Sequence, residues 1–453
     1  MGGRSWHTTR PKRDGILSRQ IRVAMMQSLE IGVERIRHAE GLRRIRISVG
    51  DVVLTRLVRP DSRKEDQWLE APPDQLAFWL IDNWWRIRWE PAPPDRFHPG
   101  WRLAHDLSSI GGGYIWPCVS IWGEGPKLGV ASQADLQVRT QSVRFLTDGL
   151  YYVSASNMIS SVDAFVDSLL DDDAIADRQS LRVEYQQLLT ERSDPEIADW
   201  RRLEAKLGFD PDEAPTELMD RLGQLMERYG HDGVEEAAVA HQGHQAAAML
   251  QEEVETARNS DVRITPPAEA EAICVERDSE RTPWQLAEGA AADLRARLAH
   301  DRGPIRNRAL SEILCLASDQ LKTKRVPAPL NYGLRLRDTD GAGSLVAMKA
   351  KWSHSRRYEL CRTLGDIIWS DNDSLGPLSA AKSGRQKFQR TFAQSFLCPF
   401  DDLQAYMDAE HPEDDDIQAA ARHFHVPVRM IQTLLVNKGV IGRASFEEMI
   451  EAA

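Results

Sequence analysis

The sequence has few cysteines and no long apolar segment. Its 453 residues contain no run of 18 apolar residues, so neither a membrane-spanning helix nor membrane association is predicted. The five cysteines are scattered and form no CxxC pair, which indicates free thiols in a reducing compartment. The first 15 residues are basic but lack the apolar stretch of a secretory signal. These absences predict a soluble cytoplasmic protein.

Common motifs of nucleotide and metal sites are also missing. The glycines 111–113 have neither GxGxxG spacing nor the GK[ST] ending of a phosphate loop. His241 and His244 form HxxH, but the glutamate of HExxH and a third ligand are absent. His98 and His105 likewise have no third partner nearby in the sequence. We therefore expect these histidines to be structural or exposed, and expect no cofactor.

Charge is distributed unevenly along an acidic chain. The formal net charge is −12, whereas residues 1–46 hold 11 Lys and Arg against 4 Asp and Glu. An acidic protein is a poor general ligand for nucleic acid. The basic N-terminal arm could still contact RNA, DNA or an acidic partner, although a solvated helix face is the plainer interpretation.

Residues 1–155 predict a tryptophan-rich α+β domain. An amphipathic helix is expected over Ile16–His38, followed by a hairpin that turns at Gly50-Asp51. Asp74 is a suitable N-cap for an apolar helix, and residues 111–132 predict a strand, a turn and a strand. Nine of the 13 tryptophans precede residue 125. Because they lie inside apolar runs, we expect a core of indoles rather than a base-stacking surface.

Residues 156–275 predict an acidic, helical region suited to a scaffold or interaction role. Glycine and proline separate the expected helices. The first is capped by Ser160 or Ser161, and Val234–Asn259 is predicted as one long helix. The expected helices are Ser160–Leu170, Arg178–Glu191, Ile197–Leu207, Thr216–Tyr229 and Val234–Asn259. Residues 260–272, with two consecutive prolines, look like a linker.

Residues 276–453 carry the most recognisable pattern. TPWQLAEGAAADLRARL and GPIRNRALSEIL predict two helices, and NYGLRLRDTDGAGSLVAMKAKWSHS predicts a β-hairpin. RRYELCRTLGDIIW and QKFQRTFAQSFLCP predict a pair of helices separated by a loop over residues 370–384. This stretch resembles the ImmA/IrrE family of zinc-dependent peptidase-like proteins. The resemblance implies a mainly helical, zincin-like domain with a small sheet, within an α+β multidomain protein.

The resemblance also implies where a zinc site would lie, and that its ligands are missing. In the family, one helix carries HExxH and the next supplies an acidic third ligand. Aligning the shared leucine and glycine places Arg362 at the first histidine, Thr363 at the general-base glutamate and Asp366 at the second histidine. Gln386 falls where the third ligand is expected. Arginine repels Zn²⁺ and glutamine ligates it poorly, so no metal is predicted.

Two interpretations of these four positions remain open. Arg362 and Asp366 are four residues apart on one helical face, so they could form a buried hydrogen-bonded cluster with Gln386. Alternatively, the positions keep a pocket in which Arg362 binds an anion, a carboxylate or a small polar ligand. Either interpretation makes the domain a pseudo-peptidase without catalytic residues.

The expected function is therefore a non-catalytic, ImmA/IrrE-like protein that binds a protein partner or a small polar ligand. The family resemblance implies a setting in regulation, stress response or phage defence. A true metallopeptidase cleaving a repressor or antitoxin would need ligands from elsewhere, such as His354, His423 or His425. A nucleic-acid-binding regulator is a third alternative, since residues 414–441 resemble a helix-turn-helix. Its second helix, however, offers only Arg429 and Lys438 as basic contacts.

Overall fold

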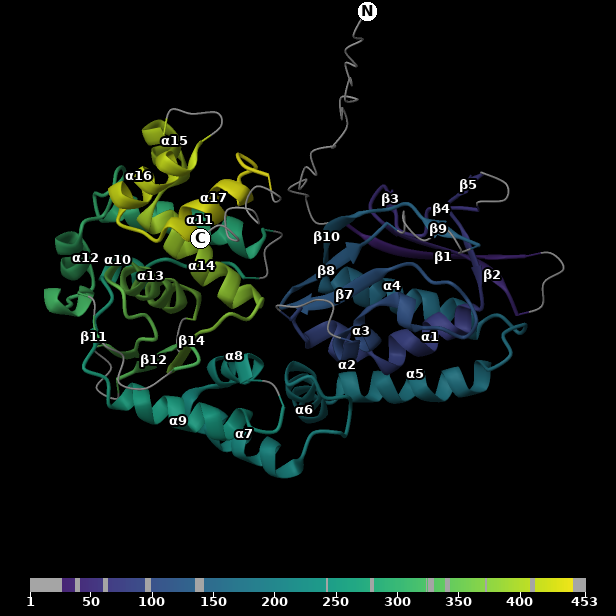
Figure 1. Cartoon of the computed structure of the whole chain (residues 1–453). Coiled ribbons are helices and arrows are strands. Elements are labelled where there is room, and N and C mark those ends of the chain that lie inside the picture. Colours follow the sequence, from purple (N-terminus) through teal and green to yellow (C-terminus); the bar gives the residue numbers. More distant parts are fainter. Residues whose placement is uncertain are drawn as a thin grey trace, which may run out of the picture.

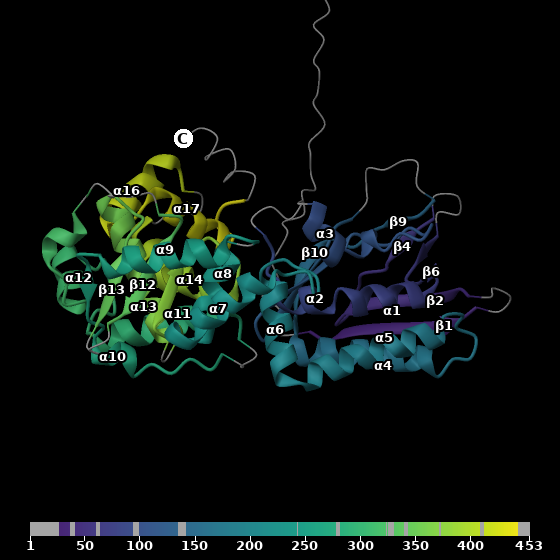
Figure 2. The same ribbon diagram turned by 90° about the horizontal axis from the view of Figure 1, so that it is seen from below.

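The computed structural model describes most of the chain as two lobes that share one helix and meet at a second contact (Figures 1 and 2). It describes residues 27–36, 41–59, 64–93, 99–134, 142–241, 243–277, 281–322, 324, 330–338, 343–370, 373–407 and 412–442. Helices and several small antiparallel sheets occur together, so the predicted α+β class is confirmed. Within these ranges, no helix has both the length and the apolar composition to cross a bilayer.

The first sheet of the N-terminal lobe corrects one prediction. Residues expected to lie in a helix over Ile16–His38 form a strand from Leu29 to Arg35, and residues 1–26 lie outside the described part. The strand pairs along its whole length with its neighbour, whose side chains Ile45, Ile47 and Val49 are buried. Strand pairing thus overrides helical spacing here. The four strands are β1 (Leu29–Arg35), β2 (Arg43–Val49), β3 (Val52–Val53) and β6 (Leu69–Ala71).

The two predicted hairpins of this lobe are confirmed. β2 and β3 pair antiparallel around Gly50, whose φ of +54° suits glycine. The predicted strand, turn and strand are β7 and β8, which pair antiparallel, and β10 joins them in the order β10-β8-β7. Its strands are β7 (Val119–Glu124), β8 (Lys127–Ser132) and β10 (Gly149–Ser154). A third, minor sheet joins β4 (Leu57–Val58), β5 (Glu65–Asp66) and β9 (Arg144–Phe145).

Helices cover these sheets and bury most of the tryptophans. Asp74 lies in the first turn of its helix rather than at the N-cap, because Pro72 occupies that position. Ser154, and neither Ser160 nor Ser161, caps the first helix after the sheets. The helices are α1 (Pro73–Asp82), α2 (Trp84–Trp89), α3 (Pro99–His105), α4 (Ala155–Leu170) and α5 (Arg178–Ser193). The indole core is confirmed for the buried Trp79, Trp84, Trp85, Trp101, Trp116 and Trp122.

The helical middle connects the lobes. The long helix predicted over Val234–Asn259 is two helices, interrupted around the left-handed Gly243 with φ +72°. His241 ends the first of them and His244 lies in the interruption, so the two do not share a helical face. The helices are α6 (Pro195–Lys206), α7 (Thr216–Tyr229), α8 (His231–His241) and α9 (Ala246–Arg258).

A four-stranded antiparallel sheet in the order β11-β13-β12-β14 forms one layer of the C-terminal lobe. Two of its strands lie where loops were predicted, in the 260–272 linker and in the 370–384 segment. The predicted hairpin is confirmed, with Leu334 opposite Ala347. The strands are β11 (Arg263–Ile264), β12 (Gly333–Arg337), β13 (Ser344–Ala347) and β14 (Leu375–Leu378).

Helices predicted for this lobe are present, and two of them, α13 and α14, pack closely. The terminal pair turns at His425, which has the left-handed φ of +55°. The capping box predicted at residues 445–448 lies outside the described residues. The helices are α10 (Ala268–Glu271), α11 (Pro283–Arg297), α12 (Asn307–Ile313), α13 (Ser353–Trp369), α14 (Gly384–Leu397), α15 (Phe400–Met407), α16 (Asp414–Phe424) and α17 (Val428–Asn437).

Helix α6 belongs to both hydrophobic cores. Its Ala205 packs in the core of the N-terminal lobe, whereas Leu203 packs with α7, α8, α9 and the sheet of the C-terminal lobe. A second contact joins β10 to α11, where the rings of Tyr152 and Trp284 meet edge to face with centroids 5.3 Å apart. An ion pair between Lys387 of α14 and Glu124 of β7 adds to it. The start of α14 thus lies at the junction of the lobes.

Candidate functional site

Close packing of α13 against α14 fixes the positions that the family resemblance singles out. Gly365 of α13 faces Phe392 of α14, and an added Cβ would lie 3.0 Å from the phenylalanine Cδ1. Phe388, Phe392 and Phe396 form a stacked row along α14, with centroid separations of 6.2 and 5.6 Å. Ser383 caps this helix by accepting a hydrogen bond from the backbone N–H of Gln386. The small residue and the aromatic row therefore bring the two helices together.

Asp366 lies at the centre of a buried ion cluster. Its carboxylate is fully buried and accepts hydrogen bonds from Arg335 Nε at 3.0 Å and Arg385 Nε at 2.7 Å. Gln389 Nε2 donates a third, also at 2.7 Å. Arg335 comes from β12, Asp366 from α13, and Arg385 and Gln389 from α14. Both carboxylate oxygens are therefore occupied by side chains of the protein.

The two arginines keep this carboxyl group ionised. Burial by itself would raise the pKa of Asp366, but Arg385 and Arg335 outweigh it and hold the pKa below its usual range. Arg385 also pairs with Asp373 at 2.7 Å and donates to the carbonyl of Leu375. The cluster thus ties the start of α14 to β14 and to the loop before it.

Arg362 and Gln386 meet as predicted, but Arg362 does not pair with Asp366. Arg362 Nη2 donates to Gln386 Oε1 at 2.6 Å, to Gln389 Oε1 at 3.1 Å and to the carbonyl oxygen of Ser379 at 2.8 Å. Gln389 therefore bridges Arg362 and Asp366, since its amide accepts from one and donates to the other. The predicted cluster forms, with glutamine where a direct ion pair was expected.

Thr363 takes no part in this network. It is fully buried, and its hydroxyl donates to the backbone carbonyl of Glu359 at 3.0 Å, one turn earlier in the helix. Glu359 in turn accepts from the backbone N–H groups of Lys349 and Ala350. Burial raises the pKa of Glu359 despite these bonds. Its carboxylate therefore anchors the chain before α13.

Three residues of the cluster were missed in the sequence. Arg385 and Gln389 flank Gln386 on the same side of α14 as the phenylalanine row, and all are buried. Polar residues interleaved with buried phenylalanines could have indicated an internal polar network. Arg335 carried no such indication, because it lies on a strand 31 residues before its partner.

Alternative zinc ligands do not gather around this cluster. His423 stacks on Tyr406 at a centroid separation of 4.2 Å, and His425 faces Arg306. His354 is exposed in the first turn of α13. Across the described ranges, no group of three or more His, Cys, Asp or Glu side chains is arranged to hold a metal ion.

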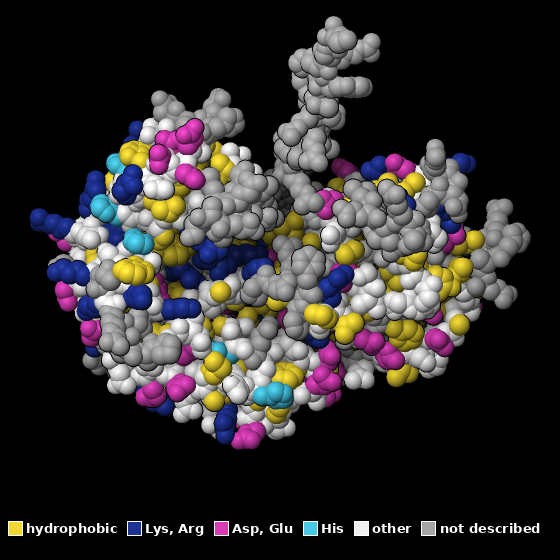
Figure 3. Space-filling view, viewed as in Figure 1, with side chains coloured by type: hydrophobic (Ala, Val, Ile, Leu, Met, Phe, Trp, Pro, Cys, Tyr) yellow, Lys and Arg dark blue, Asp and Glu magenta, His cyan; other side chains and the backbone are white. Residues whose placement is uncertain are grey.

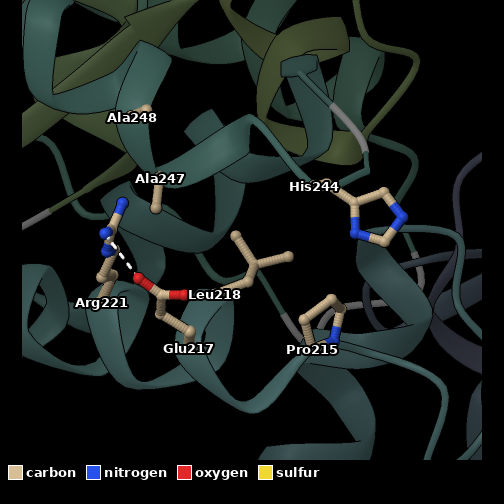
Figure 4. Close-up of a pocket in the computed structure, with 7 residues that line it drawn as sticks. All are labelled: Pro215, Glu217, Leu218, Arg221, His244, Ala247 and Ala248. Atoms are coloured by element: carbon tan, nitrogen blue, oxygen red, sulfur yellow. Dashed lines mark hydrogen bonds and ion pairs between the residues drawn. The ribbon is translucent and has the colours of Figure 1, made fainter.

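A surface depression of about 250 Å³ lies on α7 and α9, away from the ion cluster (Figure 4). Glu217 and Arg221 form an ion pair of 2.6 Å on one side of it, and Pro215 and His244 lie at the other. Because its charged side chains neutralise each other and its remaining lining is aliphatic except for His244, the depression offers little to orient a polar ligand.

Comparisons with known proteins return no relative. No protein-family model matches the chain, no curated protein matches it, and no solved structure matches it.

Proposed function

We propose that the protein is a non-catalytic, ImmA/IrrE-like pseudo-peptidase that acts by binding a protein partner or a small polar ligand. The observation that supports this proposal is the occupation of Asp366 by Arg335, Arg385 and Gln389. A zinc ligand must present a free lone pair to the metal, and a catalytic site also needs two further ligands and a base. Asp366 instead faces two cations.

The mainly helical, zincin-like character of the C-terminal lobe is part of the same proposal. It rests on the family resemblance together with the packing of α13 on α14. The proposed setting in regulation, stress response or defence rests on the family resemblance alone. The proposed cytoplasmic location rests on the free thiols.

Metal content tests the proposal directly. The purified chain would be incubated with excess Zn²⁺, dialysed and analysed by mass spectrometry, with Asp366→Ala as the matched variant. We expect no stoichiometric zinc in either protein and no zinc-dependent hydrolysis of unfolded casein. One zinc per chain that is lost in Asp366→Ala would overturn the proposal and favour the metallopeptidase alternative.

The nucleic-acid alternative receives no specific support from the described residues. On α17, Arg429 is exposed, but Lys438 just beyond it pairs with Glu288 at 2.7 Å. The acidic residues Asp414, Asp415 and Asp416 open α16. A recognition helix for DNA would present several basic side chains on one face.

A further inference from the structure

Basic side chains gather in the hollow between the lobes, over the region of α14 (Figure 3). Arg362 of α13 and Arg390 of α14 are both partly exposed. Arg362 Nη2 and Arg390 Nη1 approach the same oxygen, the carbonyl of Ser379, at 2.8 and 3.5 Å. The two guanidinium groups therefore lie next to each other around one backbone carbonyl.

Neither arginine has a carboxylate within ion-pair distance among the described residues. Arg362 bonds to two glutamine amides and a carbonyl, and Arg390 Nη2 donates to the carbonyl of Ala381 at 3.0 Å. The nearby carboxylates are engaged elsewhere. Asp366 faces Arg335 and Arg385, and Glu236 accepts from Ser383. Glu359 accepts from two backbone N–H groups before α13. Arg362 and Arg390 thus carry two positive charges that no carboxylate of the described residues neutralises at contact distance.

The pKa values of the two arginines agree with their burial and close approach. Burial and, after it, the neighbouring Arg362 lower the pKa of Arg390 to about 10. Burial also lowers the pKa of Arg362. Two like charges held side by side repel, and the repulsion is relieved by a bound anion.

The charge and shape of the pair favour one class of anion. A phosphomonoester carries about −1.5 to −2 charges near neutral pH and presents three acceptor oxygens. Guanidinium groups bind phosphate through paired N–H donors, so two adjacent arginines match both its charge and its geometry. A carboxylate supplies only one charge, and each phosphate of a nucleic-acid backbone also supplies only one.

We propose that Arg362 and Arg390 form a binding site for the phosphomonoester group of a small molecule. This inference rests on the proposed non-catalytic role of the α13–α14 region, because it assigns a ligand to the place where the family resemblance puts zinc. Tyr358 lies beside the pair, and its hydroxyl donates to the backbone carbonyl of Arg390 at 3.4 Å. The ring is thus positioned at the edge of the proposed site.

Calorimetric titration with AMP, adenosine and inorganic phosphate tests the site in the full chain. We expect AMP and inorganic phosphate to bind and adenosine to fail, since the phosphate provides the recognition. Arg390→Gln should weaken AMP binding about 10- to 100-fold, the effect of losing a charge-assisted hydrogen bond. Arg308→Gln is the matched control, because it removes one positive charge from a pair with Glu312 on α12 and should leave affinity unchanged.

Arg390 is the preferred position because Arg362 also holds the two glutamines and its loss could unfold the site. Arg390→Lys keeps the charge but removes the paired donors, so it should bind AMP with intermediate affinity. Equal binding of AMP and adenosine, absence of binding at about 10 mM AMP, or unchanged affinity in Arg390→Gln would each overturn the inference. Tighter binding of a single-stranded oligonucleotide or a phosphoserine peptide than of AMP would overturn the small-molecule assignment.

Zinc analysis of the same preparations separates this inference from the proposed function. Phosphate binding together with stoichiometric zinc would overturn the non-catalytic role and leave the phosphate site standing. Absence of both zinc and phosphate binding would overturn only the phosphate site.

Discussion

The two lobes each bury a carboxylate between two basic side chains, and they differ in what surrounds it. In the N-terminal lobe, Glu90 accepts from Arg86 at 2.7 Å and from His105 at 2.9 Å. Arg86 also reaches Asp210 at 3.1 Å. In the C-terminal lobe, Asp366 faces Arg335 and Arg385. The neighbouring Arg362 and Arg390 have no carboxylate at contact distance among the described residues.

This difference separates a structural cluster from a candidate binding site. The Glu90 cluster is closed, because His105 is fully buried, stacks on Trp101 and directs its other ring nitrogen to the carbonyl of Ile121. The Asp366 cluster continues through Gln389 to Arg362, which is partly exposed. The Asp366 cluster therefore differs from the Glu90 cluster in having surplus positive charge on its partly exposed side.

The largest loss of stability is expected when Asp366 loses its charge. Asp366→Asn leaves Arg335 buried with no ion-pair partner among the described residues, while Arg385 keeps only Asp373. Breaking a buried ion pair in this way costs about 3–5 kcal/mol. Glu90→Gln should cost less, because Arg86 keeps Asp210. Urea unfolding of both variants at neutral pH measures the two free energies. Equal losses would show that the clusters are equivalent and would remove the contrast between the lobes.

A second effect comes from close packing around the same carboxylate. In Gly376→Ala, the added Cβ would lie 1.9 Å from Asp366 Oδ2 and 2.7 Å from Arg335 Nε, so the cluster must shift. Overpacking of this kind costs about 1–3 kcal/mol.

Gly223→Ala is the control for this substitution. It lies inside α7, where no described atom outside the neighbouring helix backbone lies within 4 Å of the added Cβ. The substitution should stabilise the protein by about 0.5–1 kcal/mol. Thermal unfolding of both variants gives the comparison, and stabilisation by Gly376→Ala would contradict the described packing.

Local sequence patterns were sufficient for the elements that build the site. Helical periodicity and stop residues located α7 at Thr216–Tyr229 and placed α13 and α14 within a few residues of their ends. These features depend on residues close together in the chain, which is why the sequence records them. The expectation that Gln386 lies opposite Arg362 came from the family resemblance and not from these patterns.

Pairing between distant segments was not visible in the sequence. β14, with the sequence LGPL, contains glycine and proline and was predicted as loop, yet it completes the sheet beside Arg335. β1 was predicted as helix because its strand character depends on β2. The partners of Asp366 depend on both the sheet and α14, so sequence spacing pointed to Arg362 instead.

The pH dependence of stability provides a third test, which concerns the charge of Asp366. Because the folded protein holds the pKa of Asp366 below the unfolded value of about 3.9, the ionised group stabilises the fold above about pH 4. That contribution is lost as the pH falls through the lower folded value. The stability difference between wild type and Asp366→Asn should therefore shrink below about pH 4 in urea unfolding. A difference independent of pH down to about pH 2 would rule out this role of the charge.

The smallest effect is expected for an ion pair that is exposed rather than buried. Arg221 pairs with Glu217 one turn earlier on α7, and both side chains are more than half exposed to solvent. Water and salt screen such a pair, so Arg221→Gln should change the free energy of unfolding by only about 0.3–0.5 kcal/mol. The urea midpoint of the variant should stay near that of wild type, and the difference between them should be still smaller at about 1 M NaCl. A loss comparable to that of Asp366→Asn would mean that burial does not determine what these charges contribute.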